Sequence, residues 1–173
     1  MAFFELINLR KTRKAILYLL CTVVALWLQT MVLSRVVLWG AKPFFLPAFI
    51  VAIGLWEGGV WGAMLGLAAG LGCTLSMAGS PVLFLVLLPA FGFLSGLLAE
   101  FLINRRFVSY LILAAAALAV TALLQALPLW IFRGAEPRAL FTVALLQALW
   151  ALPLAVPSYF AAKLLAGRER ERT

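Results

Sequence analysis

Long stretches of the chain carry no charged residue, and polar side chains are sparse within them. The uncharged runs cover residues 15–34, 58–99, 107–132 and 139–162. Because an α-helix rises ~1.5 Å per residue and the hydrocarbon core of a bilayer is ~30 Å thick, about 20 apolar residues are enough to cross it. Three of the runs therefore fit one membrane-spanning helix each, and the longest, 58–99, fits two.

Two further features divide the chain into helices. Gly79-Ser80-Pro81 interrupts the longest run, because glycine and proline both disfavour the continuation of a helix. A shorter run, 43–56, ends at Glu57 and would span a bilayer only marginally. The pattern predicts six helices, which cover residues 15–34, 43–57, 60–78, 81–103, 107–132 and 139–165.

The runs are apolar throughout and do not alternate with polar positions, which favours helices over a β-barrel. Of all residues, 66% are hydrophobic and 12% charged, whereas soluble domains have about 45–50% and about 25%. We therefore expect an all-α integral membrane protein with one transmembrane domain, residues 15–165, between basic segments 1–14 and 166–173. The first run is longer than the core of a signal peptide, so we expect it to be retained as a helix.

The basic residues predict the orientation of this bundle. If both termini are cytoplasmic, the segments on that side hold ten of the 14 basic residues, and the opposite side holds four. The positive-inside rule favours this arrangement. The net charge of +8 is then a topology signal that also attracts anionic lipid headgroups. Because the basic residues flank spans and form no separate domain, we expect no nucleic-acid partner.

Glycines recur four residues apart in two of the predicted helices. Gly62, Gly66 and Gly70 share one face of the third helix, and Gly92 and Gly96 share one face of the fourth. Small residues let helix backbones approach closely in lipid, where the hydrophobic effect between helices is weak. We expect these two helices to form a tight hairpin. The alternative is that a transmembrane helix of a partner protein packs against one of the glycine faces. In the fifth helix, Ala115 and Ala119 offer a similar small face.

A few polar side chains lie within or beside the predicted spans: Gln29, Glu57, Glu100, Gln125 and Gln147. A buried amide needs a hydrogen-bond partner, so Gln125 and Gln147 are expected to bond each other or a backbone carbonyl. An acid at membrane depth is a candidate functional residue. However, Glu100 can also extend toward the interface and pair with Arg105.

The residues needed for several kinds of membrane enzyme are missing from these 173 residues, which contain no histidine and no aspartate. A rhomboid-type serine protease needs a Ser–His pair, and aspartate-rich lipid transferases hold Mg²⁺ with carboxylates. Two cysteines cannot complete a four-ligand zinc site. We therefore expect no enzymatic activity, no cofactor and no metal.

The stretch from Leu28 to Phe107 resembles the MreD family, the small membrane component of the bacterial rod-shape machinery. The similar residues are Leu28-Gln29-Thr30, Leu46-Pro47, Trp56-Glu57-Gly58-Gly59-Val60-Trp61-Gly62-Ala63, Gly66, Gly70, Gly79-Ser80-Pro81 and Gly92-Phe93-Leu94-Ser95-Gly96-Leu97. Length, the basic start and the basic tail are also similar. The chain differs in being neutral from Gly70 to Ser76, where family members often carry an acid.

The resemblance implies a non-enzymatic protein of the bacterial plasma membrane. Its partner would be MreC, a membrane-anchored periplasmic scaffold, and the pair would help to position cell-wall synthases relative to actin-like MreB filaments. The alternative is a substrate-binding membrane subunit of an energy-coupling-factor vitamin transporter, which is similar in size and also has six spans. Such subunits dock their transporter through an Ala-x-x-x-Ala face on the first helix, and Ala15 and Ala25 do not form one.

Overall fold

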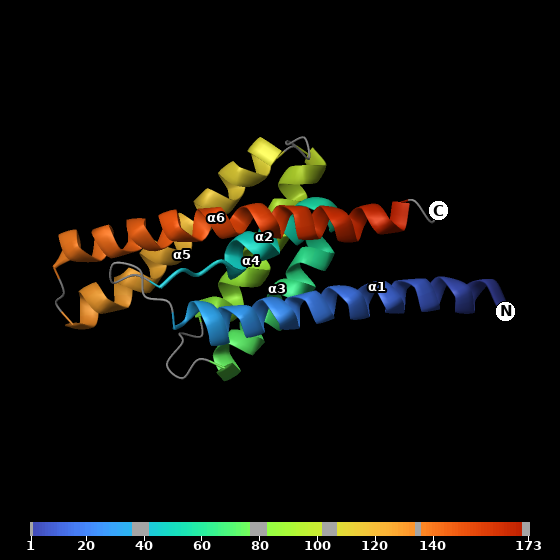
Figure 1. Cartoon of the computed structure of the whole chain (residues 1–173), viewed down its shortest axis with the longest axis horizontal. Helices are drawn as coiled ribbons and strands as arrows, with labels where there is room; N and C mark the ends of the chain where they lie inside the picture. The colour runs from blue at the N-terminus through green and yellow to red at the C-terminus, as the bar shows by residue number, and fades with distance from the viewer. Residues whose placement is uncertain (1, 36–41, 77–82, 102–106, 134–135, 171–173) are drawn as a thin grey trace.

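The computed structural model describes residues 2–35, 42–76, 83–101, 107–133 and 136–170, in which every regular element is a helix. The start of the first helix and the end of the last lie at the same end of the long axis (Figure 1). The elements are α1 (Ala2–Trp27), the π-helix η1 (Leu28–Leu33), α2 (Leu46–Glu57), α3 (Gly59–Ser76), α4 (Leu83–Phe101), α5 (Phe107–Arg133) and α6 (Pro137–Arg170).

Five helical stretches are long and apolar enough to cross a membrane, the shortest with 18 residues and the longest with 30. The exception is α2, whose 12 residues rise only about 18 Å, well short of the hydrocarbon thickness. The described helices are therefore those of a multi-pass membrane protein. The segment that the sequence marked as a marginal span is an interior helix.

The short helix α2 forms the centre of the bundle. Every residue from Leu46 to Leu55 is buried, so no side of the helix faces the surroundings. A helix that is apolar all round must be enclosed, and α3, α4, α5 and α6 all pack against it (Figure 1). Pro47 lies at the start, where its missing N–H and fixed φ are compatible with a helix.

The glycines of α3 and α4 let these two helices meet backbone to backbone. A Cβ atom at Gly62 would overlap the carbonyl of Gly92, and one at Gly92 would overlap the carbonyl of Gly62. A Cβ atom at Gly66 would lie 2.6 Å from the Leu88 carbonyl oxygen, and one at Gly70 would lie 2.7 Å from that of Phe84. The glycine faces therefore form an internal contact.

The same contact extends to α2. A Cβ atom at Gly54 would overlap the Ser95 hydroxyl and the Gly92 carbonyl, and one at Gly96 would overlap Gly59 at the start of α3. Since α2, α3 and α4 converge on these glycines, none of the predicted glycine faces is free for a partner's helix. The Gly79-Ser80-Pro81 turn lies outside the described residues.

Alanines take the place of the glycines on the other side of α2. Ala114 and Ala117 of α5, with Ala151 and Ala155 of α6, are at most 4% exposed and pack around α2. The expectation that Ala115 and Ala119 form the small face of this helix is wrong, because Ala115 is half-buried and Ala119 is exposed. The face of α5 that is buried is the neighbouring one, with Ala114 and Ala117, because α2 packs there. The sequence pattern of α5 alone does not indicate this contact.

The outer helices extend beyond the apolar runs that predicted them. The helix expected at 15–34 begins at Ala2 and ends in a π-helical stretch, and the one expected at 139–165 runs from Pro137 to Arg170. Charged residues end a hydrophobic run without ending a helix, because Lys, Arg and Glu are good helix formers. The described parts of the basic segments, residues 2–14 and 166–170, are thus helical extensions of the spans.

Candidate functional site

Among the described residues, an ion pair joins α1 to the end of α2. Lys14 Nζ lies 2.6 Å from Glu57 Oε2, and the Tyr18 hydroxyl donates a hydrogen bond to Glu57 Oε1 at 2.5 Å. The Glu57 side chain is 8% exposed and the Lys14 side chain 22% exposed. Lys14 and Tyr18 are one helical turn apart and share a face, so a single carboxylate binds two successive turns of α1.

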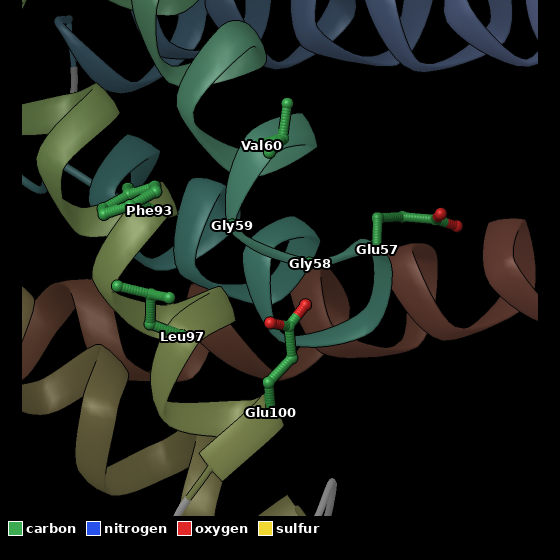
Figure 2. Close-up of a pocket in the computed structure, with 7 residues that line it drawn as sticks. All are labelled: Glu57, Gly58, Gly59, Val60, Phe93, Leu97 and Glu100. Atoms are coloured by element: carbon green, nitrogen blue, oxygen red, sulfur yellow. The ribbon is translucent and has the colours of Figure 1, made fainter.

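The chain reverses sharply next to Glu57, and this reversal forms one wall of a small pocket. Gly58 has φ +95°, which side chains rarely adopt, and α3 begins immediately after it. The pocket has a volume of about 140 Å³ and is open to the surroundings. It is lined by Glu57, Gly58, Gly59, Val60, Phe93, Leu97 and Glu100 (Figure 2).

The two acids of this region face different groups. Figure 2 shows the Glu100 carboxylate pointing toward the Gly58–Gly59 backbone, and the Glu57 carboxylate pointing away from it. A Cβ atom at Gly58 would lie 3.2 Å from Glu100 Oε1. Glu100 thus lies close to the first turn of α3, where the helix dipole favours a negative charge. Its expected pairing with Arg105 involves a residue outside the described ranges.

An aromatic cluster lies beside α2 and was missed by the sequence reasoning. The Tyr159 ring is 5.1 Å from the Tyr110 ring, 5.2 Å from the Phe107 ring and 5.8 Å from the Trp56 ring, measured between centroids. The Tyr110 hydroxyl lies 2.9 Å from the carbonyl of Ala155 and 3.2 Å from that of Ala48. Tyr110 therefore joins α5 to both α6 and α2 at a fully buried position.

Gln29 lies at the opposite end of α2 from Glu57 and binds the non-helical segment that leads into that helix. Its Nε2 donates to the Pro43 carbonyl at 3.0 Å, and its Oε1 accepts from the Phe45 N–H at 3.1 Å. Gln29 is 2% exposed. Its amide thus satisfies two backbone groups that have no helical partner before α2 begins.

Replacing Gln29 with methionine should destabilise the protein by about 2 kcal/mol, because a buried N–H and a buried carbonyl both lose their partner while side-chain volume is kept. Thermal unfolding in detergent, followed by circular dichroism, measures this loss. Thr74→Val is the matched control: among the described residues, that hydroxyl donates to the Gly70 carbonyl of its own helix, so we expect little change. Equal stability of the two variants would contradict the role of Gln29.

The contacts of Gln29 and Glu57 hold α1 and η1 against the two ends of α2. The buried side chains on α1 and η1 recur every three or four residues, which is the spacing of one helix face. They are Tyr18, Thr22, Ala25, Gln29 and Leu33. Lys14 and Tyr18 were not selected from the sequence. Polar residues spaced three or four apart within an otherwise apolar helix are the sequence signal that could have identified Lys14 and Tyr18.

Gln125 of α5 and Gln147 of α6 are brought together by the last helical hairpin. Gln147 Nε2 donates to Gln125 Oε1 at 3.3 Å, one of the two arrangements that the sequence allowed. Gln125 Nε2 is buried and has no hydrogen-bond partner in the described part of the chain. The polar residues chosen from the sequence are thus in three separate places: beside Glu57, at Gln29 and in this hairpin.

Among the described residues, no group of three or more His, Cys, Asp or Glu is placed to hold a metal ion. Comparisons with known proteins found no matching family model, no matching curated protein and no matching solved structure.

Proposed function

We propose that this chain is a non-enzymatic membrane protein that acts through contacts of its helices. More particularly, we propose that it serves the bacterial rod-shape machinery as a relative of MreD, in the plasma membrane and with both termini cytoplasmic. Its partner would be an MreC-like periplasmic scaffold, and its role would be to help position peptidoglycan synthesis beside actin-like filaments.

The resemblance between Leu28 and Phe107 is the observation that carries this proposal. The architecture supports it, because the segments that resemble the family are the ones that form the bundle centre. Trp56 and Glu57 end α2, Gly62 and Gly66 pack α3, and Gly92 packs α4. A sequence similarity concentrated on the packing of three helices is what a shared membrane fold requires.

The proportions of the chain also support action by contact. Most described residues lie in helices. The ion pair of Lys14 with Glu57 is internally satisfied, and the described pocket of about 140 Å³ is much smaller than the ~300–1,000 Å³ of typical ligand sites. Helix surfaces in the membrane are therefore the most extensive part of the molecule available to a partner.

Affinity purification of the full chain from detergent-solubilised bacterial membranes tests this proposal. We expect a single-span protein with a periplasmic coiled coil to be recovered with it, and depletion of the chain to convert rods into rounded cells. Membranes that contain the same chain without the affinity tag serve as the control for non-specific recovery. Recovery of energy-coupling ATPases in place of a periplasmic scaffold would overturn the proposal in favour of a vitamin-binding subunit.

A further inference from the structure

One side of the α3–α4 hairpin is left uncovered by the other described helices. Each of the two helices presents there a row of exposed or half-buried side chains at the three- and four-residue spacing of one helix face. The six residues of these rows, which we call the hairpin face, are Val60, Met64 and Leu67 of α3 and Phe93, Leu97 and Glu100 of α4. Four of them line the described pocket (Figure 2), so both rows point to the same side of the hairpin.

Glu100 places a negative charge at one end of the hairpin face. The start of α3 beside it offsets only about half of that charge, and the structure gives Glu100 no ion pair with a residue in the described ranges. The other acid of the pocket, Glu57, points away from it (Figure 2). Lipid chains cannot solvate a carboxylate. This end of the hairpin face therefore favours a cationic group.

The first helix of the same chain shows how a membrane span satisfies an acid at this end of the bundle. Lys14 of α1 lies 2.6 Å from the Glu57 carboxylate, and the apolar residues that follow it pack α1 against α3. A basic residue at the end of a span and an apolar surface beyond it thus hold one helix beside the Gly58 reversal. Glu100 and the hairpin face offer the same two features beside the same reversal (Figure 2), and no helix of the described chain uses them.

We infer that the hairpin face binds a transmembrane helix of another protein, and that this helix carries an arginine or lysine at the end that lies beside Glu100. The basic group occupies the pocket, whose volume of about 140 Å³ has room for the end of one side chain. The apolar residues of the bound helix pack over Val60, Met64 and Leu67. In the proposed orientation Glu100 lies at the cytoplasmic end, where basic residues commonly flank membrane spans.

A synthetic peptide tests this inference on the purified full chain, so the test does not depend on the proposed function or on its scaffold. The peptide is an apolar helix of about 20 leucine and alanine residues, which spans a bilayer, with a single arginine near one end. A second peptide has glutamine at that position. Energy transfer between labelled chain and labelled peptide in phosphatidylcholine vesicles measures association. We expect the arginine peptide to bind about threefold to tenfold more tightly, as for a partly enclosed ion pair.

Variants at Glu100 make this test specific to the hairpin face. Glu100→Gln should bind the two peptides equally, and Glu100→Arg should prefer a peptide with glutamate in place of the arginine. Glu136→Gln is the matched control, because it removes another exposed acid, directly before α6, and it should keep the preference for arginine. Equal binding of the two peptides by the wild type would overturn the inference and leave Glu100 to Arg105 of the same chain or to a lipid headgroup. An equal loss of preference in Glu136→Gln would also overturn it.

Cysteine cross-linking shows whether the peptide lies on the hairpin face. In a background with Cys21→Ala and Cys73→Ala, Met64→Cys should form a disulfide with a cysteine in the middle of the arginine peptide when an oxidant is added. Leu20→Cys is the matched control, because Leu20 is 58% exposed and Met64 62%, and Leu20 lies as far beyond Lys14 as Met64 lies beyond Gly58. Equal cross-linking from both positions, or none from Met64→Cys, would contradict docking on this face.

Discussion

Replacement of Gly62 by leucine is expected to destabilise the protein by about 3 kcal/mol or more, the upper range of overpacking. A side chain at this position would overlap the Gly92 carbonyl, and its Cβ atom would lie 2.8 Å from Gly54 Cα. These obstacles are backbone atoms of α4 and α2, which cannot rotate away as a side chain can. The three helices would have to separate, and with them the centre of the bundle.

Unfolding with sodium dodecyl sulfate in mixed micelles measures this effect. Gly167→Leu is the matched control, since a Cβ atom there meets nothing within 4 Å, and its stability should stay near that of the wild type. Gly72→Ala should give an intermediate result, because the atoms nearest its Cβ belong to the end of the flexible Leu26 side chain. A Gly62→Leu variant as stable as Gly167→Leu would mean that α3 and α4 do not touch at this glycine.

The second large effect is expected at Glu57. Glu57→Leu should cost about 2–4 kcal/mol, because it removes the carboxylate that pairs with the Lys14 charge and accepts the hydrogen bond of the Tyr18 hydroxyl. Lys14 is 22% exposed and can turn partly toward the interface, which keeps the expected loss below that of a fully buried pair.

A double-mutant cycle isolates the ion pair from the packing around it. Lys14→Met alone should also destabilise the protein, and Lys14→Met/Glu57→Leu should be more stable than the sum of the single losses predicts. Glu100→Leu provides the control at an exposed acid nearby, with an expected change of at most about 1 kcal/mol from the lost interaction with the start of α3. Additive losses at Lys14 and Glu57 would show that the two charges do not interact.

Together, the contacts at Glu57 and Gln29 explain how α1 is kept in place. Its membrane-spanning stretch is 28% buried, and large apolar side chains such as Leu20 and Val23 are exposed for lipid to cover. Apolar surface gives little preference for neighbouring helices over lipid. The polar groups near both ends of α2 supply that preference and fix the position of α1.

The hydrophobic pattern was enough to find the spans, because the thickness of a bilayer sets one length for all of them. The end of the helix at Glu57 followed from the charge that ends the apolar run. The start at Ala2 did not follow, because helix formation continues through charged residues that leave the hydrocarbon. The hydrophobic pattern also could not predict the interior position of α2, because an apolar run has the same sequence pattern whether lipid or protein surrounds it.

The sequence by itself determined that this protein lies in a membrane, that it is helical, and which glycines permit close packing. These properties depend on solvent, chain geometry and side-chain size, all of which are local. Only the tertiary structure decided that Glu57 meets Lys14 and Tyr18, that Gln29 binds the backbone before α2, and that Gln125 is left with a free donor. Such contacts join residues that are distant in the chain. The hydrophobic pattern of a membrane helix does not specify which other helices pack against it, because all of them have similar apolar sequences.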